Sequence, residues 1–124
     1  LSGYMFMLVC GGFFMTMVFQ LAHIVPNLKF VATHEVNIPE NWYIHQLQTT
    51  SNFALGNRFV TAAIGGLNYQ IEHHLFPSVC HVHYPEIAPI VQQTCREFGL
   101  PYHQLPSVRA AVRGHFILLK SLGN

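Results

Sequence analysis

The sequence has 124 residues, of which 51% are hydrophobic and only 9% are charged. This length suits one small domain rather than two, and the charged fraction lies well below the roughly 25% usual for soluble domains. The composition therefore favours a membrane-associated protein. The net charge is +1 and the six cations are scattered along the chain, which argues against a nucleic-acid partner.

The three cysteines indicate a reducing compartment. Cys10, Cys80 and Cys95 are widely separated and form no CxxC pair, so they fit neither a disulfide framework nor a zinc ribbon. We expect each of them to be a small buried apolar side chain.

Residues 1–25 predict a transmembrane helix that ends near His23. They carry no charge, and at about 1.5 Å per residue about 20 helical residues cross a hydrocarbon core of about 30 Å. A buried soluble helix is the alternative, because Gly11, Gly12 and Gln20 weaken the apolar run. The run starts at once, without a basic stretch or a cleavage site, so we expect no signal peptide and a chain that is part of a longer polypeptide.

Residues 26–77 predict an interfacial region. Residues 26–56 combine a mixed polar loop with a short helix, and Trp42 and Tyr43 suit the headgroup level. Residues 57–77 predict a helix that Pro77 ends and that Gly65 and Gly66 kink or open to a neighbour. Its apolar middle is too short to span a bilayer, so we expect it to lie along the membrane surface.

Residues 78–124 predict a cytosolic helical cap. Pro85 suits a first helical position and Gly99 a C-terminal cap, which places a helix over residues 86–98. A further helix with one apolar face is expected over residues 107–122. The predicted fold class is an all-α integral membrane protein with one transmembrane helix, an interfacial helix and this cap.

The clearest chemical pattern is Gln70-Ile-Glu-His73-His74, in a chain with nine histidines and five carboxylates. The spacing i, i+3 and i+4 places Gln70, His73 and His74 on one helical face. Imidazole suits iron, zinc, copper and nickel, but the zinc patterns HExxH and HxE with PCxxC are absent. Because neighbouring side chains on a helix point about 100° apart, His73 and His74 favour two adjacent metals over one.

His23 is a further candidate, because it closes the apolar helix with Gln20 on the same face. An ionisable group at the end of a membrane helix is by default a functional hypothesis. A histidine that extends to the interface is the alternative.

Gln70 to Pro77, QIEHHLFP, resembles the third histidine box of membrane fatty acyl desaturases, in the QxxHH form of the front-end branch. The flanking Gly65–Gln70, the stretch 45–52 and Tyr102-His103 are similar to that family as well. The resemblance implies a non-haem di-iron centre that uses O2 to introduce a double bond into a (poly)unsaturated acyl chain. It also implies electrons from cytochrome b5 or a ferredoxin, and an acyl-lipid or acyl-CoA substrate.

On this resemblance, His73 and His74 are expected to bind iron, together with His23 from the end of the membrane helix. Gln70 is the weakest of the four, because a neutral amide is a poorer ligand and can instead hold a metal-bound water.

Three further residues are candidates for supporting a ligand. Glu72 faces away from the array and is either such a partner or a solvated carboxylate, His45 is either a partner or an interfacial histidine, and Gln20 shares the face of His23. The remaining histidines are expected in loop, surface or structural roles: His34, His81, His83, His103 and His115.

Two upstream boxes of the family, HxxxH and HxxHH, do not occur ahead of His73, and HPGG is also missing. We therefore expect the C-terminal part of a desaturase that is inactive alone. The expected location is the endoplasmic reticulum or a bacterial inner membrane, with the histidine site towards the cytosol. The alternatives are a related di-iron hydroxylase, a sphingolipid desaturase, and a non-catalytic membrane protein of the same fold.

Overall fold

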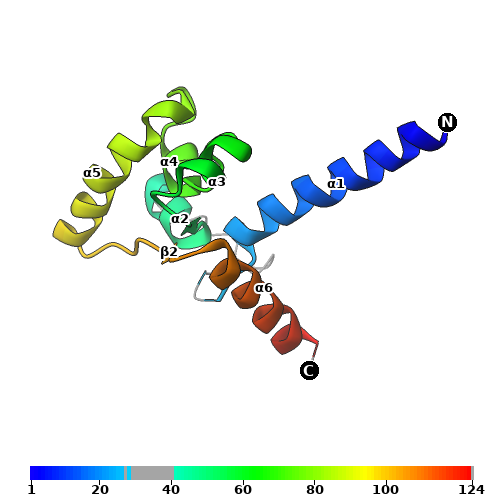
Figure 1. Ribbon diagram of the computed structural model, residues 1–124. Coiled ribbons are helices and arrows are strands. Elements are labelled where there is room, and N and C mark those ends of the chain that lie inside the picture. The colour runs from blue at the N-terminus through cyan, green and yellow to red at the C-terminus, as the bar shows by residue number, and fades with distance from the viewer. Residues whose placement is uncertain (27, 29–40, 124) are drawn as a thin grey trace.

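A single long apolar helix, α1 (Ser2–His23), projects from the other elements, which gather near its C-terminal end (Figure 1). The computed structural model describes residues 1–26, 28 and 41–123. His34 and most of the predicted interfacial loop lie outside these residues. The further elements are α2 (Trp42–Thr49), β1 (Asn52–Phe53), α3 (Arg58–Ala63), α4 (Gln70–Leu75), the 3-10 turn η1 (His81–His83), α5 (Tyr84–Glu97), β2 (Gln104–Leu105) and α6 (Val108–Leu122).

The helix α1 has the length and composition of a membrane span. It has 22 residues, and it is the one helix in the described ranges that is long and apolar enough to cross a bilayer. Its side chains are exposed over most of its length, with burial at Val18, Leu21 and Ala22 near its C-terminal end. Such exposure fits lipid contact better than it fits the buried soluble helix considered above.

The prediction of one helix across residues 57–77 is wrong. The helix α3 ends at Ala63, and α4 begins at Gln70. Between them Gly65 and Gly66 adopt φ values of +60° and +77°, a left-handed conformation that glycine adopts readily and that ends a helix instead of kinking it. The ligand array therefore stands on a separate helix of six residues.

The all-α prediction misses one small sheet. Strands β1 and β2 are parallel, with Asn52 opposite Gln104 and Phe53 opposite Leu105. The Asn52 N–H donates to the His103 carbonyl at 3.0 Å, and the Ala54 N–H donates to the Leu105 carbonyl at 3.0 Å. Two-residue strands are too short to show an alternating pattern, but this pair brings the chain before α6 beside the chain after α2.

The two predicted C-terminal helices are confirmed. The helix α5 begins with Pro85 in its first turn and is followed by Gly99 at φ +65°. At the start of α6 the Ser107 side chain accepts the Ala110 N–H at 3.1 Å, as an N-terminal cap does. His115 is buried in α6, and its Nδ1 donates to the Ile24 carbonyl at 2.9 Å, which confirms its structural role.

Apolar packing holds α4 between two other helices. Ile71 is fully buried against Leu47 of α2 and against Val91 and Cys95 of α5, and α5 lies on the far side of α4 from α1 (Figure 1). A second cluster joins the end of α1 to β1 and α6.

The expectation for the cysteines holds for one of the three. Cys95 is buried, whereas Cys10 and Cys80 are exposed. Cys10 lies on the apolar helix α1, where most side chains are exposed, and Cys80 precedes the turn η1.

We predict that Gly66→Ala destabilises the protein more than Gly56→Ala. Both glycines have left-handed φ values, +80° at Gly56, so both substitutions carry a conformational cost of about 1–2 kcal/mol. At Gly66 the new methyl group would also stand 2.7 Å from the His81 Cβ, whereas at Gly56 it meets no atom within 4 Å. Thermal unfolding of the full-length protein in detergent compares the two variants, and equal losses of Tm would contradict this account.

Candidate metal site

The structure brings together the four residues predicted as metal ligands. The end of α1 contributes His23, and α4 contributes Gln70, His73 and His74. The imidazole centroids of His23 and His74 lie 5.1 Å apart, and those of His73 and His74 lie 5.7 Å apart. The Nε2 atoms of Gln70 and His23, 47 residues apart in sequence, are separated by 3.2 Å. The set of predicted ligands thus combines three residues of α4 with one residue of α1.

Two of these histidines have their ring orientation set by α2. The Nδ1 of His74 lies 2.7 Å from Oε1 of Gln46, and the Nδ1 of His23 lies 3.4 Å from the carbonyl oxygen of Thr49. Because both partners are acceptors, each Nδ1 carries the proton and donates it. This tautomer leaves Nε2 of each ring with the lone pair that a metal takes, and partners of this kind orient histidine ligands in metal sites.

His73 is oriented from the other side by α5. Its Nδ1 lies 3.4 Å from the Tyr84 hydroxyl, and the two ring centroids are 6.3 Å apart. Tyr84 is itself buried, and this burial raises the pKa of its hydroxyl. The hydroxyl therefore stays protonated at neutral pH.

The environment keeps His74 neutral. Burial, followed by the nearby His23 and His73, lowers the pKa of His74 to about 4. At pH 7 its imidazole is consequently uncharged, which is the form that binds a metal ion.

Gln70 has an oxygen without a partner. The side chain is 3% exposed, and its Oε1 is buried with no hydrogen-bond partner among the described residues. Its Nε2 donates towards the His23 Nε2, at 3.2 Å. A buried acceptor left unpaired is costly, and a metal ion or a metal-bound water near this oxygen would satisfy it.

The donor set fits part of an imidazole-rich metal site. Imidazole nitrogens and an amide oxygen are ligand types that iron accepts. The unpaired Gln70 oxygen is consistent with a nearby cation or a cation-bound water. Within residues 1–26, 28 and 41–123, no group of three or more His, Cys, Asp or Glu side chains is placed to hold a metal ion by itself. A complete site would need further donors.

Glu72 is a buried residue and not the solvated carboxylate that the sequence left open. It is 0% exposed, and its Oε2 accepts from the Asn52 Nδ2 at 2.8 Å while its Oε1 accepts from the Tyr102 hydroxyl at 2.9 Å. Burial raises the pKa of Glu72, although both hydrogen bonds act in the opposite direction. Burial and the adjacent Glu72 also raise the pKa of Tyr102.

Asn52 and Tyr102 are not among the site residues that the sequence predicts. Both lie in stretches that resemble the family, and that resemblance was the available signal. Their contacts with Glu72 span 20 and 30 residues, so no spacing rule could pair them.

The other two predicted partners, His45 and Gln20, make no side-chain hydrogen bond to the four predicted ligands among the described residues. The side-chain contact from α2 to His74 comes from Gln46 and not from its neighbour His45. The His45 carbonyl accepts the Thr49 hydroxyl at 2.9 Å. Gln20 lines a hollow on α1 together with Phe19 and Ile24. His81 and His83 are exposed in η1.

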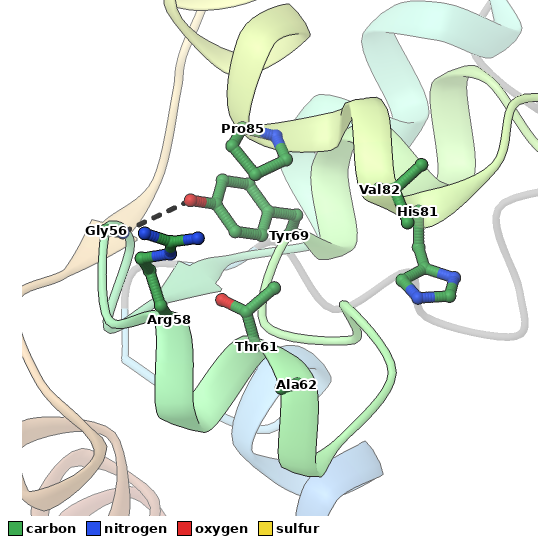
Figure 2. Close-up of a pocket in the computed structure, with 8 residues that line it drawn as sticks. All are labelled: Gly56, Arg58, Thr61, Ala62, Tyr69, His81, Val82 and Pro85. Atoms are coloured by element: carbon green, nitrogen blue, oxygen red, sulfur yellow. Dashed lines mark hydrogen bonds between the residues drawn. The ribbon is translucent and has the colours of Figure 1, made fainter.

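A cavity of about 490 Å³ opens beside this region, between α3 and η1 (Figure 2). At its wall the Tyr69 hydroxyl accepts the Gly56 N–H at 3.1 Å. None of the four predicted ligands lines it, so it is separate from the array. The lining consists of Gly56, Arg58, Thr61, Ala62, Tyr69, His81, Val82 and Pro85.

The known proteins that this chain resembles are fatty acid desaturases. The family model for fatty acid desaturases matches residues 1–106. The chain is 45% identical over 112 residues to an acyl-lipid (8-3)-desaturase of Physcomitrium patens, covering 90% of this chain and 23% of that protein. It is 39% identical over 108 residues to an sn-1 linoleoyl-lipid 6-desaturase of Synechocystis sp., covering 86% of this chain and 30% of that protein. A Delta(5) fatty acid desaturase A of Dictyostelium discoideum is 39% identical over 118 residues, covering 91% of this chain and 25% of that protein.

All three relatives are named as desaturases, and they confirm the resemblance to front-end desaturases that Gln70–Pro77 indicates. The chain spans about a quarter of their length, from 23% to 30%. No solved structure matches it with comparable significance. The match over residues 1–106 is most of the 124-residue chain, and the chain therefore belongs to the fatty acid desaturase family.

Proposed function

We propose that this chain forms the C-terminal part of a front-end fatty acyl desaturase, which uses O2 to insert a double bond into a polyunsaturated or unsaturated acyl chain. The observation that carries this proposal is the convergence of His23, His73 and His74 beside the unpaired oxygen of Gln70. The names of the relatives support the reaction class.

The metal would be a pair of non-haem iron ions, held on this chain by His23, His73 and His74, with Gln70 as an additional contact. When bound, iron would supply the oxidant that removes hydrogen from an unactivated methylene group, which no side chain can do. The remaining ligands would come from the two histidine boxes that the family resemblance places upstream of these residues.

The protein's own groups orient the three imidazole rings and set the tautomer of two of them. Gln46 and the Thr49 carbonyl hold the Nδ1 protons of His74 and His23, which leaves a lone pair on each Nε2. The His23 lone pair accepts from the Gln70 Nε2, so a metal would take the place of this amide at His23. Tyr84 limits the rotation of the His73 ring. These contacts preorganise the donors before a metal arrives, which reduces the reorganisation that binding requires.

The position of the array fits a lipid substrate. His23 is the last residue of the apolar helix α1, so the array would lie at the boundary of the membrane, where an acyl chain can reach it from the bilayer. We propose the endoplasmic reticulum or a bacterial inner membrane, with the array towards the cytosol and with cytochrome b5 or a ferredoxin as electron donor.

We predict that His73→Ala abolishes the desaturated product of the full-length protein and lowers its iron content, because it removes an imidazole donor. The test is fatty-acid analysis by gas chromatography in cells fed an unsaturated precursor, with iron measured on the purified protein. His83→Ala, an exposed histidine of η1, is the matched control and should retain both. Full activity of His73→Ala at equal protein level would refute the ligand assignment.

We predict that Gln46→Leu weakens iron binding by about 10–100-fold, the usual effect of losing a partner behind a histidine ligand. The leucine is similar in size but cannot accept the His74 Nδ1 proton. Gln46→Glu restores an acceptor and should recover most of the affinity. Competition with a chelator measures both variants against Gln48→Leu, which changes the same helix elsewhere, and an unchanged affinity in Gln46→Leu would contradict the role of Gln46.

A further inference from the structure

The helix α4 carries three of the predicted ligands but has few stabilising interactions of its own. It contains six residues, and its N-cap residue Tyr69 makes no side-chain capping hydrogen bond. A helix this short is unstable by itself, and the N–H groups of its first turn have no partner within the helix. Its position and rotation must therefore be set by other parts of the protein.

Asn52 of β1 supplies the missing cap from outside the helix. Its Oδ1 accepts the backbone N–H of Ile71 at 2.8 Å, and its Nδ2 donates to the Glu72 Oε2 at 2.8 Å. The side chain is 0% exposed, so neither bond competes with water. One amide group thus holds both the first turn of α4 and a side chain on it.

Tyr102 closes a ring of three residues. Its hydroxyl donates to the Glu72 Oε1 at 2.9 Å and accepts from the Asn52 Nδ2 at 2.8 Å. Both oxygens of the Glu72 carboxyl group are therefore engaged. The backbone next to Tyr102 is anchored as well, because the His103 carbonyl accepts the Asn52 N–H.

The direction of Glu72 makes this ring a rotational constraint. With about 100° per residue, Glu72 points away from the face that carries Gln70, His73 and His74. Rotation of α4 about its axis would move the carboxyl group off both donors. Apolar packing of Ile71 tolerates small rotations better, because hydrogen bonds weaken steeply with angle.

We propose that Glu72, together with Asn52 and Tyr102, positions α4 and thereby aims His73 and His74 at the metal. This inference rests on the proposed function, because it assumes that the two histidines bind iron. Glu72 is a positioning residue here and does not contact the metal. A buried carboxyl group is weak evidence for stability as such, whereas its two directed bonds specify one orientation of the helix.

The test uses the full-length protein in lipid nanodiscs. Tyr102→Phe removes one hydroxyl group and keeps the aromatic side chain. Glu72→Gln keeps the shape of the side chain, but its amide presents a donor to the Asn52 Nδ2 or the Tyr102 hydroxyl, which are donors themselves. Tyr43→Phe and Glu86→Gln are matched controls, because both side chains are exposed. Iron affinity is measured by chelator competition, and amide hydrogen exchange is followed in a peptide covering residues 70–75 before iron is added.

We expect Tyr102→Phe and Glu72→Gln to bind iron about 10–100-fold more weakly and to exchange faster in residues 70–75, with both controls unchanged. Because the two side chains act in one ring, the double variant should lose less than the product of the two single effects. Iron affinity and exchange like those of the wild type, even with a lowered Tm, would overturn the positioning role.

Two outcomes keep this inference separate from the proposed function. If the wild type itself binds no iron, the proposed function fails, and the positioning role towards a metal fails with it. If the wild type binds iron and Tyr102→Phe binds it equally well, only the positioning role fails. Should Glu72→Gln not fold, Tyr102→Phe decides alone, since it removes a single hydroxyl group.

Discussion

The relative rotation of two helices is the constraint on which the histidine cluster depends, and polar groups set it. His23 lies on α1 and the other three members lie on α4. Their side chains meet only while α4 presents one particular face to the end of α1. The hydrogen-bonded ring of Asn52, Glu72 and Tyr102 fixes that face from behind, and α2 holds the imidazole rings of His23 and His74. Apolar contacts of Ile71 bring the helix into place, and the directed bonds decide which way it faces.

Local signals were strong enough to predict the longer elements. The uncharged run of α1, the Pro85 and Gly99 that bound α5, and the amphipathic pattern of α6 each predicted a helix that the structure contains. The prediction of one helix over residues 57–77 fails, because the apolar spacing continues past Gly65 and Gly66 although their positive φ values end the helix there. The strands were missed because a two-residue pairing leaves no periodic trace.

In the candidate site as well, the residues with a local sequence signal were predicted and those joined only by tertiary contacts were not. The spacing of Gln70, His73 and His74 is a property of one helical turn, so the sequence alone predicted that they share a face. His23 joined them through its place at the end of an apolar helix and through family resemblance. The partners Gln46, Asn52 and Tyr102 are 20 to 30 residues away from the α4 side chains that they contact. Their roles follow from tertiary contacts, which no periodicity encodes.

The sheet pair also imposes an order in time. Tyr102 is 30 residues beyond Glu72, and synthesis proceeds at about 5–20 residues per second, so it is made about 1.5–6 s after Glu72. During that interval α4 lacks the third member of its ring, and β1 lacks the strand that pairs with it. The polar support of α4 is therefore completed late in synthesis, once the chain through Leu105 has left the ribosome.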